Sequence, residues 1–374
     1  MRFMIIFAGF MATLTSTSPN ALADHSPKKM MRNMNAFSQL GETGKLGPFK
    51  INVAVFGRKP SDKLTYKANA RINSFLQDDL NLASIVLKNG STISERYNAG
   101  QNINSNTPLL GMSMSKTAAG AVIGFLLCEG KIRSLDDKAG LYSKFLKSTP
   151  YAKVSIRNIL QMNSGVSPLG RSDEKKFTQK SRGVRKFKNQ ANVREALNFY
   201  KSAAREQGTR MNYHSSDTLA LSVLAEDITG TPLSKLFYEK VYVKFGESNY
   251  MHWTGDNTGT TVAFSGLVMT ARDWAEFGQY LMAQKKAKTC LGEFFNEGVK
   301  NSVSTGKTNG SRYGYQFWVF DVAGTPSLVL QGHGGQFVVL NERANTVLLT
   351  ISINEKYKVG NLFSKIHKIA AKIN

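Results

Sequence analysis

Cysteine and histidine are scarce in this chain of 374 residues. Its two cysteines, Cys128 and Cys290, are too few for a disulfide framework. We interpret both as buried or free thiols, and a single disulfide between them is the alternative in an oxidising compartment. The five histidines show no clustered metal-ligand spacing, so the sequence implies neither a metal site nor an organic cofactor.

Long apolar runs are also missing. No segment beyond the N-terminus has about 20 unbroken apolar residues, the length that a membrane-spanning helix needs, so no transmembrane anchor is predicted. The N-terminus is typical of an export signal, with an apolar stretch over residues 3–14 and the small-residue site Ala21-Leu22-Ala23. We predict a signal peptide over residues 1–23, cleaved after Ala23, and we expect a periplasmic or secreted protein.

Acidic residues are outnumbered, because 26 Asp and Glu stand against 49 Lys and Arg, for a formal net charge of +23 at pH 7. The excess is concentrated between residues 171 and 205, in Lys175, Lys176, Lys180, Arg182, Arg185, Lys186, Lys188 and Arg194. Such a field attracts polyanions. No nucleic-acid-binding motif accompanies it, so we expect no nucleic acid and favour an anionic cell-envelope polymer as a partner. A solvated surface that only aids solubility is the alternative.

The pair Ser113-x-x-Lys116 stands at the start of an apolar helical run over residues 118–127. Residues three apart lie on one face of a helix, so the Lys116 amine can reach the Ser113 hydroxyl. A lysine kept neutral by burial and by nearby positive charge can accept the serine proton. The same spacing begins at Ser26 and at Ser304, but neither has a hydrophobic helix behind it. An N-cap serine followed by a solvated lysine is the alternative interpretation.

The order of predicted elements indicates an α+β protein. Residues 83–97 predict a β-hairpin that turns at Asn89-Gly90, and the Ser113 helix that follows ends near Gly130. Mostly helical spacing comes next, then strands over residues 313–353 and a closing helix over residues 359–373. We therefore divide the mature chain into an N-terminal extension (24–60), an α/β core domain (61–135 and 256–374) and a helical insertion domain (136–255).

Two further motifs flank predicted elements. Tyr213-His214-Ser215 precedes a helix, and a tyrosine hydroxyl beside a cationic lysine is easier to ionise and can move a proton between nucleophile and leaving group. An amphipathic tyrosine packed at a domain junction is the alternative. The run from Gly332 to Gln336 lies between two strand-like segments, where a backbone N–H paired with that of Ser113 can form an oxyanion hole. A glycine hairpin turn is the alternative there.

In this order, the motifs resemble the serine β-lactamase and penicillin-binding-protein superfamily, specifically its class C-like branch. That branch includes class C β-lactamases, D-alanyl-D-alanine carboxypeptidases, family VIII esterases and nylon-oligomer (6-aminohexanoate-dimer) hydrolases. The resemblance spans residues 83–353 and is strongest in the segments 111–117, 159–166, 208–218 and 270–278.

The resemblance implies roles for individual residues. Ser113 would be the nucleophile, Lys116 its activating partner, and Tyr213 the base and then the acid. Ser215 stands where the β-lactamases have the asparagine of Tyr-x-Asn, so the resemblance implies a substrate-binding role for it, as for Gly332, His333 and Gln336. Tyr-x-Ser looks more like the nylon-oligomer hydrolases.

The family's Lys-Thr-Gly strand motif would fall on Leu330-Gln331-Gly332, which makes the N–H of His333 the oxyanion donor. A second register places His333-Gly334-Gly335 there, with Gln336 as the donor. We prefer the first, because family members with a short hairpin carry a Gly-x-Gly-Gly-Gln run at this place. It lacks the lysine that binds a β-lactam carboxylate, which disfavours efficient β-lactamase activity.

The expected fold is the β-lactamase/transpeptidase-like fold, an antiparallel sheet flanked by helices with a mostly α-helical insertion. The expected function is an exported serine hydrolase that cleaves a small ester or amide through an acyl-enzyme on Ser113. The alternatives are a D-alanyl-D-alanine carboxypeptidase, a β-lactamase, and a catalytically silent envelope-binding protein that keeps the fold.

Overall fold

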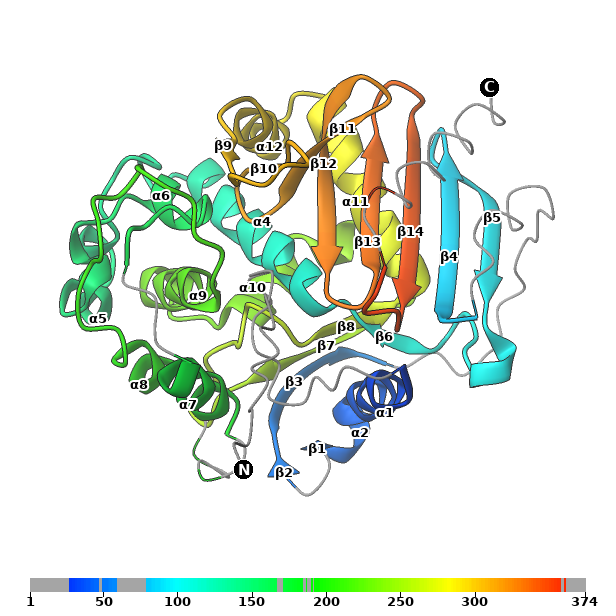
Figure 1. The fold of residues 1–374 in the computed structure, drawn as a ribbon, viewed down its shortest axis with the longest axis horizontal. Coiled ribbons are helices and arrows are strands. Elements are labelled where there is room, and N and C mark those ends of the chain that lie inside the picture. The colour runs from blue at the N-terminus through cyan, green and yellow to red at the C-terminus, as the bar shows by residue number, and fades with distance from the viewer. Residues whose placement is uncertain are drawn as a thin grey trace, which may run out of the picture.

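The computed structural model of the chain describes residues 27–46, 49–58, 79–166, 171–183, 186, 190, 192–357 and 360. The predicted signal peptide and, apart from Gly360, the predicted closing helix over residues 359–373 lie outside these residues. Antiparallel sheets flanked by helices make up the described chain (Figure 1), so the predicted α+β class is confirmed.

The larger sheet joins the N-terminal hairpin to the C-terminal strands. The hairpin turns at Asn89-Gly90 as predicted, and β14 pairs with β4 in the register Leu349↔Ile85. In spatial order the eight strands are β5 (Ser91–Tyr97), β4 (Asn81–Lys88), β14 (Thr346–Ser352), β13 (Gln336–Asn341), β12 (Thr325–Gly332), β11 (Trp318–Val322), β10 (Arg312–Tyr313) and β9 (Val303–Ser304).

The central strands of this sheet are buried on both faces. Ile85 belongs to the main core on one face, whereas its neighbour Val86 joins Phe337 and Leu348 in a second cluster on the other. Helix α11 (Ala271–Lys286) covers the main-core face (Figure 1). Successive side chains of a strand point to opposite faces of the sheet. Because both faces are buried, the sequences of these strands are continuous apolar runs.

A smaller, four-stranded sheet lies below the large sheet in the view of Figure 1. Its strands are β3 (Asn52–Gly57), β7 (Tyr250–Gly255), β8 (Leu267–Thr270) and β6 (Pro108–Leu110), and a separate ribbon pairs β1 (Lys45–Leu46) with β2 (Phe49–Lys50). Strand β7 falls inside the range 136–255 that was assigned to a helical insertion, because its residues pair with β3 and β8. The division into domains stays a prediction.

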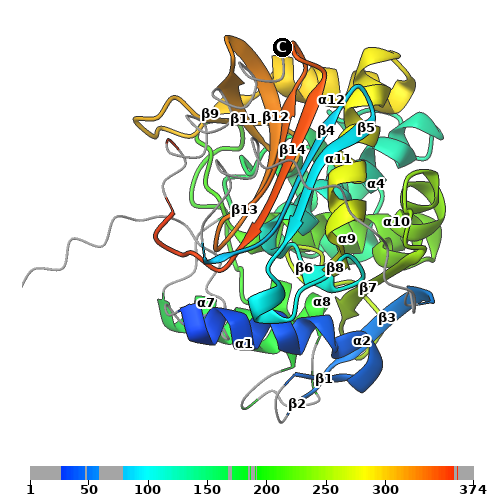
Figure 2. The ribbon, with the colours of Figure 1, turned by 90° about the vertical axis from the view of Figure 1, so that its right-hand side faces the viewer.

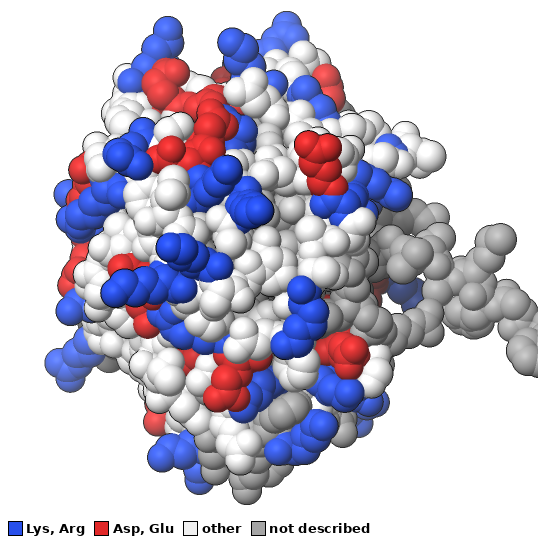
Figure 3. Space-filling view, turned by 90° about the vertical axis from the view of Figure 1, so that its left-hand side faces the viewer, with Lys and Arg blue, Asp and Glu red and all other residues white. Residues whose placement is uncertain are grey.

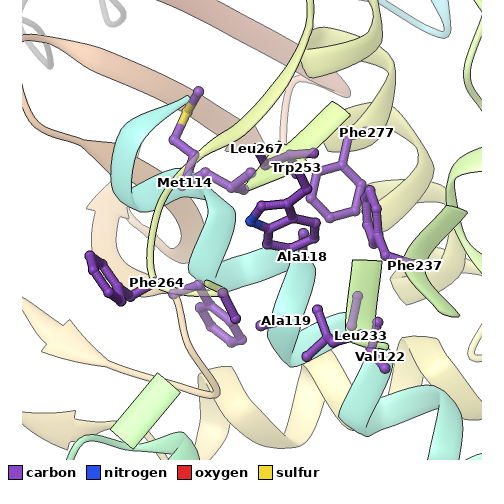
Figure 4. Packing of buried hydrophobic residues seen from close by; sticks show 14 of the residues in the cluster. Met114, Ala118, Ala119, Val122, Leu233, Phe237, Trp253, Phe264, Leu267 and Phe277 are labelled. Atoms are coloured by element: carbon purple, nitrogen blue, oxygen red, sulfur yellow. The ribbon is translucent and has the colours of Figure 1, made fainter. Parts of the chain in front are cut away.

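Helix α4 (Ser115–Cys128) lies at the centre of the molecule. It is apolar all round, and a helix of that kind is buried on every side. It packs against α9 (Ser215–Thr229), α10 (Leu233–Lys240) and α12 (Cys290–Lys300). Small side chains such as Ala118 and Ala119 let the aromatic residues of neighbouring elements approach it closely (Figure 4).

The remaining helices are short. They are α1 (Pro27–Ser38), α2 (Leu40–Thr43), α5 (Lys144–Lys147), α6 (Ile156–Leu160), α7 (Arg171–Arg182) and α8 (Val193–Leu197). Helix α1 lies alongside β6, below the large sheet in the view of Figure 2. In the part of the chain that the structure describes, no helix is both long enough and apolar enough to cross a bilayer.

The basic segment forms ion pairs in the structure. Lys180 lies 2.6 Å from Glu195, Arg194 lies 2.6 Å from Asp227, and Arg182 is buried. On the face that carries α5 to α8, Lys and Arg side chains alternate with Asp and Glu (Figure 3). The envelope polymer stays a prediction.

Cys128 and Cys290 form a disulfide, with 5.8 Å between their Cα atoms. Our preferred interpretation of both as thiols is therefore wrong, and the alternative holds. The two residues are 162 positions apart, so only the packing of the end of α4 against the start of α12 brings them together.

We expect this disulfide to stabilise the fold by about 2–5 kcal/mol, since it closes a long loop in the unfolded chain. Urea unfolding with and without reductant measures the difference. The double variant Cys128→Ser/Cys290→Ser is the control, because its unfolding curve should not respond to reductant. An unchanged curve for reduced wild type, with both thiols titrated, would contradict the expectation.

Candidate active site

Ser113 lies in a tight turn that leads into α4. It is the middle residue of a 3₁₀ turn (Met112–Met114), and α4 begins at Ser115, two residues later than the serine. The preceding Met112 has a left-handed backbone with φ of 50°, which is uncommon for a residue with a side chain and clusters at functional sites. The Ser113 side chain is half-buried in this turn.

Strand β8 holds the turn in place. The N–H of Gly111 donates to the carbonyl of Leu267 at 3.1 Å, and the N–H of Leu267 donates to Ser115 Oγ at 3.2 Å. Ser115 Oγ in turn donates to the Met112 carbonyl at 2.7 Å. This turn, residues 111–115, is the nucleophile turn, named after its candidate nucleophile Ser113, and it is tied to a sheet strand at both of its ends.

Lys116 points back toward Ser113, as the spacing predicts. Its side chain is 1% exposed, and Nζ donates to the Phe264 carbonyl at 2.9 Å and to Ser113 Oγ at 3.3 Å. Burial, and after it the positive charge of Arg182, lowers the pKa of Lys116 to about 7. A large share of the amine is therefore neutral at neutral pH, so the alternative of a solvated lysine does not hold.

Tyr213 approaches the same pair from the loop before α9. Its side chain is hydrogen-bonded to Ser113, and Lys116 Nζ lies 5.1 Å from the centre of its ring. Burial raises the pKa of Tyr213 well above its usual value, and the hydrogen bond with Ser113 offsets this only in part. The expectation of an easily ionised tyrosine is wrong, because the phenol is buried.

An aromatic wall backs Tyr213. Its ring centre lies 5.3 Å from that of Trp318 and 5.7 Å from that of Tyr313, residues that face each other across β10 and β11. Tyr357 also lies close enough to act on the pKa of Tyr213. The sequence does not predict these aromatic contacts, since nothing in the local pattern of strands β10 and β11 connects them to Tyr213.

Ser215, which the resemblance placed at the substrate, is the first residue of α9 and is 1% exposed. Two residues on, buried Asp217 accepts hydrogen bonds from Tyr151 Oη and Ser164 Oγ, each at 2.8 Å. These bonds fix the start of α9 and, with it, the loop that presents Tyr213.

The turn between β12 and β13 lies beside the nucleophile turn. A Cβ atom on Gly332 would come within 2.4 Å of the Gly111 carbonyl oxygen, so the two backbones are in direct contact. The His333 side chain binds Glu355 at 2.5 Å. The Gln336 side chain is buried and donates to the Ser352 carbonyl at 2.6 Å.

The other Ser-x-x-Lys patterns do not form such a pair. Ser304 ends β9 at an exposed position, and Lys307 Nζ lies 4.6 Å from the ring centre of Trp318. Ser26 lies outside the described residues.

Phe264 and Arg182 contribute to the site without having been predicted there. Phe264 supplies a carbonyl to Lys116, and no sequence motif marks it. Arg182 was noticed only as part of the basic segment, whereas the structure places it near enough to act on Lys116.

We predict that Gly332→Ala lowers kcat/KM about a hundredfold, because the added Cβ must displace the Gly111 backbone and with it Ser113. Steady-state kinetics on an ester substrate measures the loss. Gly100→Ala is the matched control, since the nearest atom to its Cβ is the Asn98 side-chain oxygen at 3.3 Å. Wild-type activity in Gly332→Ala would show that the two backbones need not touch.

The chain is similar in sequence to a known hydrolase. The curated 6-aminohexanoate-dimer hydrolase of Paenarthrobacter ureafaciens is 25% identical over 212 residues, which are 55% of this chain and 53% of that protein. The match thus spans about half the length of that relative.

Solved structures show the same fold. A Bacillus anthracis protein described as a 6-aminohexanoate-dimer hydrolase superposes with a TM-score of 0.75 at 21% identity, covering 97% of this chain and 98% of that chain. A β-lactamase/D-alanine carboxypeptidase from Pseudomonas syringae gives a TM-score of 0.61 at 13% identity, covering 82% and 100%. The predicted β-lactamase/transpeptidase-like fold is confirmed.

The beta-lactamase family model matches residues 76–360, which include the nucleophile turn, the Tyr213 loop and the β12–β13 turn. The chain therefore belongs to the beta-lactamase family of serine hydrolases.

Proposed function

We propose that this protein is an exported serine hydrolase that cleaves an amide or an ester through an acyl-enzyme on Ser113. The observation that carries the proposal is the 3.3 Å contact between Lys116 Nζ and Ser113 Oγ, where the pKa of the lysine is lowered to about 7. A neutral amine within hydrogen-bonding reach of a serine hydroxyl can act as its general base.

Acylation uses both ionisable partners. Ser113 Oγ attacks the substrate carbonyl and gives its proton to the Lys116 amine. As the tetrahedral intermediate collapses, the protonated hydroxyl of Tyr213 donates to the leaving group, and the Lys116 ammonium returns a proton to Tyr213. The raised pKa of Tyr213 supports this order, since it keeps the phenol protonated until the leaving group needs it.

Deacylation reverses the roles. A water molecule attacks the acyl carbonyl of the Ser113 ester and gives one proton to the neutral Lys116 amine. As the tetrahedral intermediate collapses, the bond to Ser113 Oγ breaks, the Lys116 ammonium returns that proton to Ser113 Oγ, and the acid product leaves. The N–H groups of Ser113 and His333 stabilise the oxyanion in both halves. The contact between Gly332 and Gly111 supports the N–H of His333, rather than that of Gln336, as the oxyanion donor. This contact places the start of the β12–β13 turn beside the nucleophile turn.

Linear amides and short acyl esters are the first substrates to test, since the curated relative is named a 6-aminohexanoate-dimer hydrolase. Leu330, at the position of the lysine that binds a β-lactam carboxylate, is buried and apolar. Nitrocefin and a peptidoglycan-like dipeptide separate the β-lactamase and carboxypeptidase alternatives from this proposal. The Cys128–Cys290 disulfide supports export, because disulfides persist in oxidising compartments.

A fluorophosphonate probe tests the nucleophile. We expect intact-mass analysis to show one adduct on the wild type and none on Ser113→Ala. Ser304→Ala, which alters another Ser-x-x-Lys serine, is the matched control and should label like the wild type. A folded wild type that stays unlabelled would contradict the proposal and favour a catalytically silent envelope-binding protein.

The pH profile tests the base. We expect kcat/KM for a neutral ester to rise as the pH increases through about 7 and then to level, because only the unprotonated Lys116 accepts the Ser113 proton. Lys116→Arg keeps a positive charge but cannot act as a base, so it should be inactive across the range. A profile that is flat through neutral pH would rule out Lys116 as the base.

A further inference from the structure

Arg182 is a buried cation at the end of a basic helix. It is the last residue of α7 and is 7% exposed. Its guanidinium carbon lies 4.9 Å from the centre of the Phe264 ring. A side chain that the sequence analysis counted in a basic surface segment is therefore buried beside the candidate active site.

Phe264 connects Arg182 to the Ser113–Lys116 pair. Its carbonyl accepts from Lys116 Nζ at 2.9 Å, and its ring centre lies 5.5 Å from the same nitrogen. The residue is buried and packs beside α4 (Figure 4). The Trp253 indole N–H fixes its loop by donating to the Ser265 carbonyl at 3.1 Å. The Lys116 amine and the Arg182 guanidinium therefore both lie close to the ring of one buried aromatic residue.

Arg182 and the protonated form of Lys116 carry like charges, and each charge disfavours protonation of the other group. Burial lowers the pKa of Arg182 to about 10, so the guanidinium keeps its charge at neutral pH. Lys116 is the weaker base and is the group that gives up its proton. Among the residues that the structure describes, Tyr213 also faces Lys116, and burial keeps its phenol protonated and uncharged.

We propose that Arg182 is a positioning residue for the hydrolysis, one whose fixed positive charge behind Phe264 favours the neutral amine of Lys116 and so prepares it to accept the Ser113 proton. The inference rests on the proposed function. It also gives the basic segment a role inside the enzyme, separate from any polymer at its surface.

The pH dependence of ester hydrolysis tests the inference, because a purely structural arginine would not move it. In Arg182→Met we expect the rise of kcat/KM to move to higher pH by about one unit. On the acid side of the profile, kcat/KM should then be roughly tenfold lower than in the wild type. The rate at the alkaline plateau should stay close to that of the wild type. Arg182→Lys keeps the charge and should keep the wild-type profile.

Arg194→Met is the matched control from the same basic segment. Arg194 pairs with Asp227 at 2.6 Å, so its loss should leave the profile unshifted. Arg182→Gln, which retains hydrogen-bonding groups, provides the same test if the methionine variant does not fold.

A folded neutral variant with an unshifted profile would overturn the inference. Fluorophosphonate labelling of each variant separates the two proposals. If the wild type does not label, the proposed function itself is wrong. If the proteins label but the pH profile of Arg182→Met is unshifted, only the proposed role of Arg182 is wrong.

Discussion

The burial of one amine is the constraint on which the active site depends. Lys116 is almost fully enclosed, and a buried ammonium carries a large desolvation cost. The protein meets this constraint by making the neutral form accessible at neutral pH and by giving the amine two acceptors, the Phe264 carbonyl and Ser113 Oγ. The hydrogen bond to the Phe264 carbonyl holds the amine where its nitrogen lies 3.3 Å from Ser113 Oγ.

The fold supplies the rigid surroundings that this arrangement requires. Helix α4 is enclosed by apolar side chains, β8 holds the turn before it, and the start of α9 fixes the loop that carries Tyr213. The β12–β13 turn packs against the Gly111 backbone through Gly332. Each of these elements comes from a different part of the chain, so the site is assembled only when both sheets and the helices between them have packed.

Local patterns in the sequence predicted much of this structure. The Asn89-Gly90 hairpin, the apolar helix after Ser113 and the approach of Lys116 to that serine all follow from spacing within a few residues. Features that depend on tertiary contact were harder to predict. The disulfide between Cys128 and Cys290, 162 positions apart, was only the alternative interpretation, and the place of Arg182 behind Phe264 is visible only in the packed chain.

The most direct test is to titrate the Lys116 amine itself. Protein labelled with ¹³C at lysine Cε, compared with Lys116→Arg to assign the signal, reports the protonation of this side chain by NMR. Our account predicts a midpoint near the pKa of about 7. A midpoint near the usual lysine value of about 10.4 would contradict it, because Lys116 would then be charged at neutral pH and could not serve as the base.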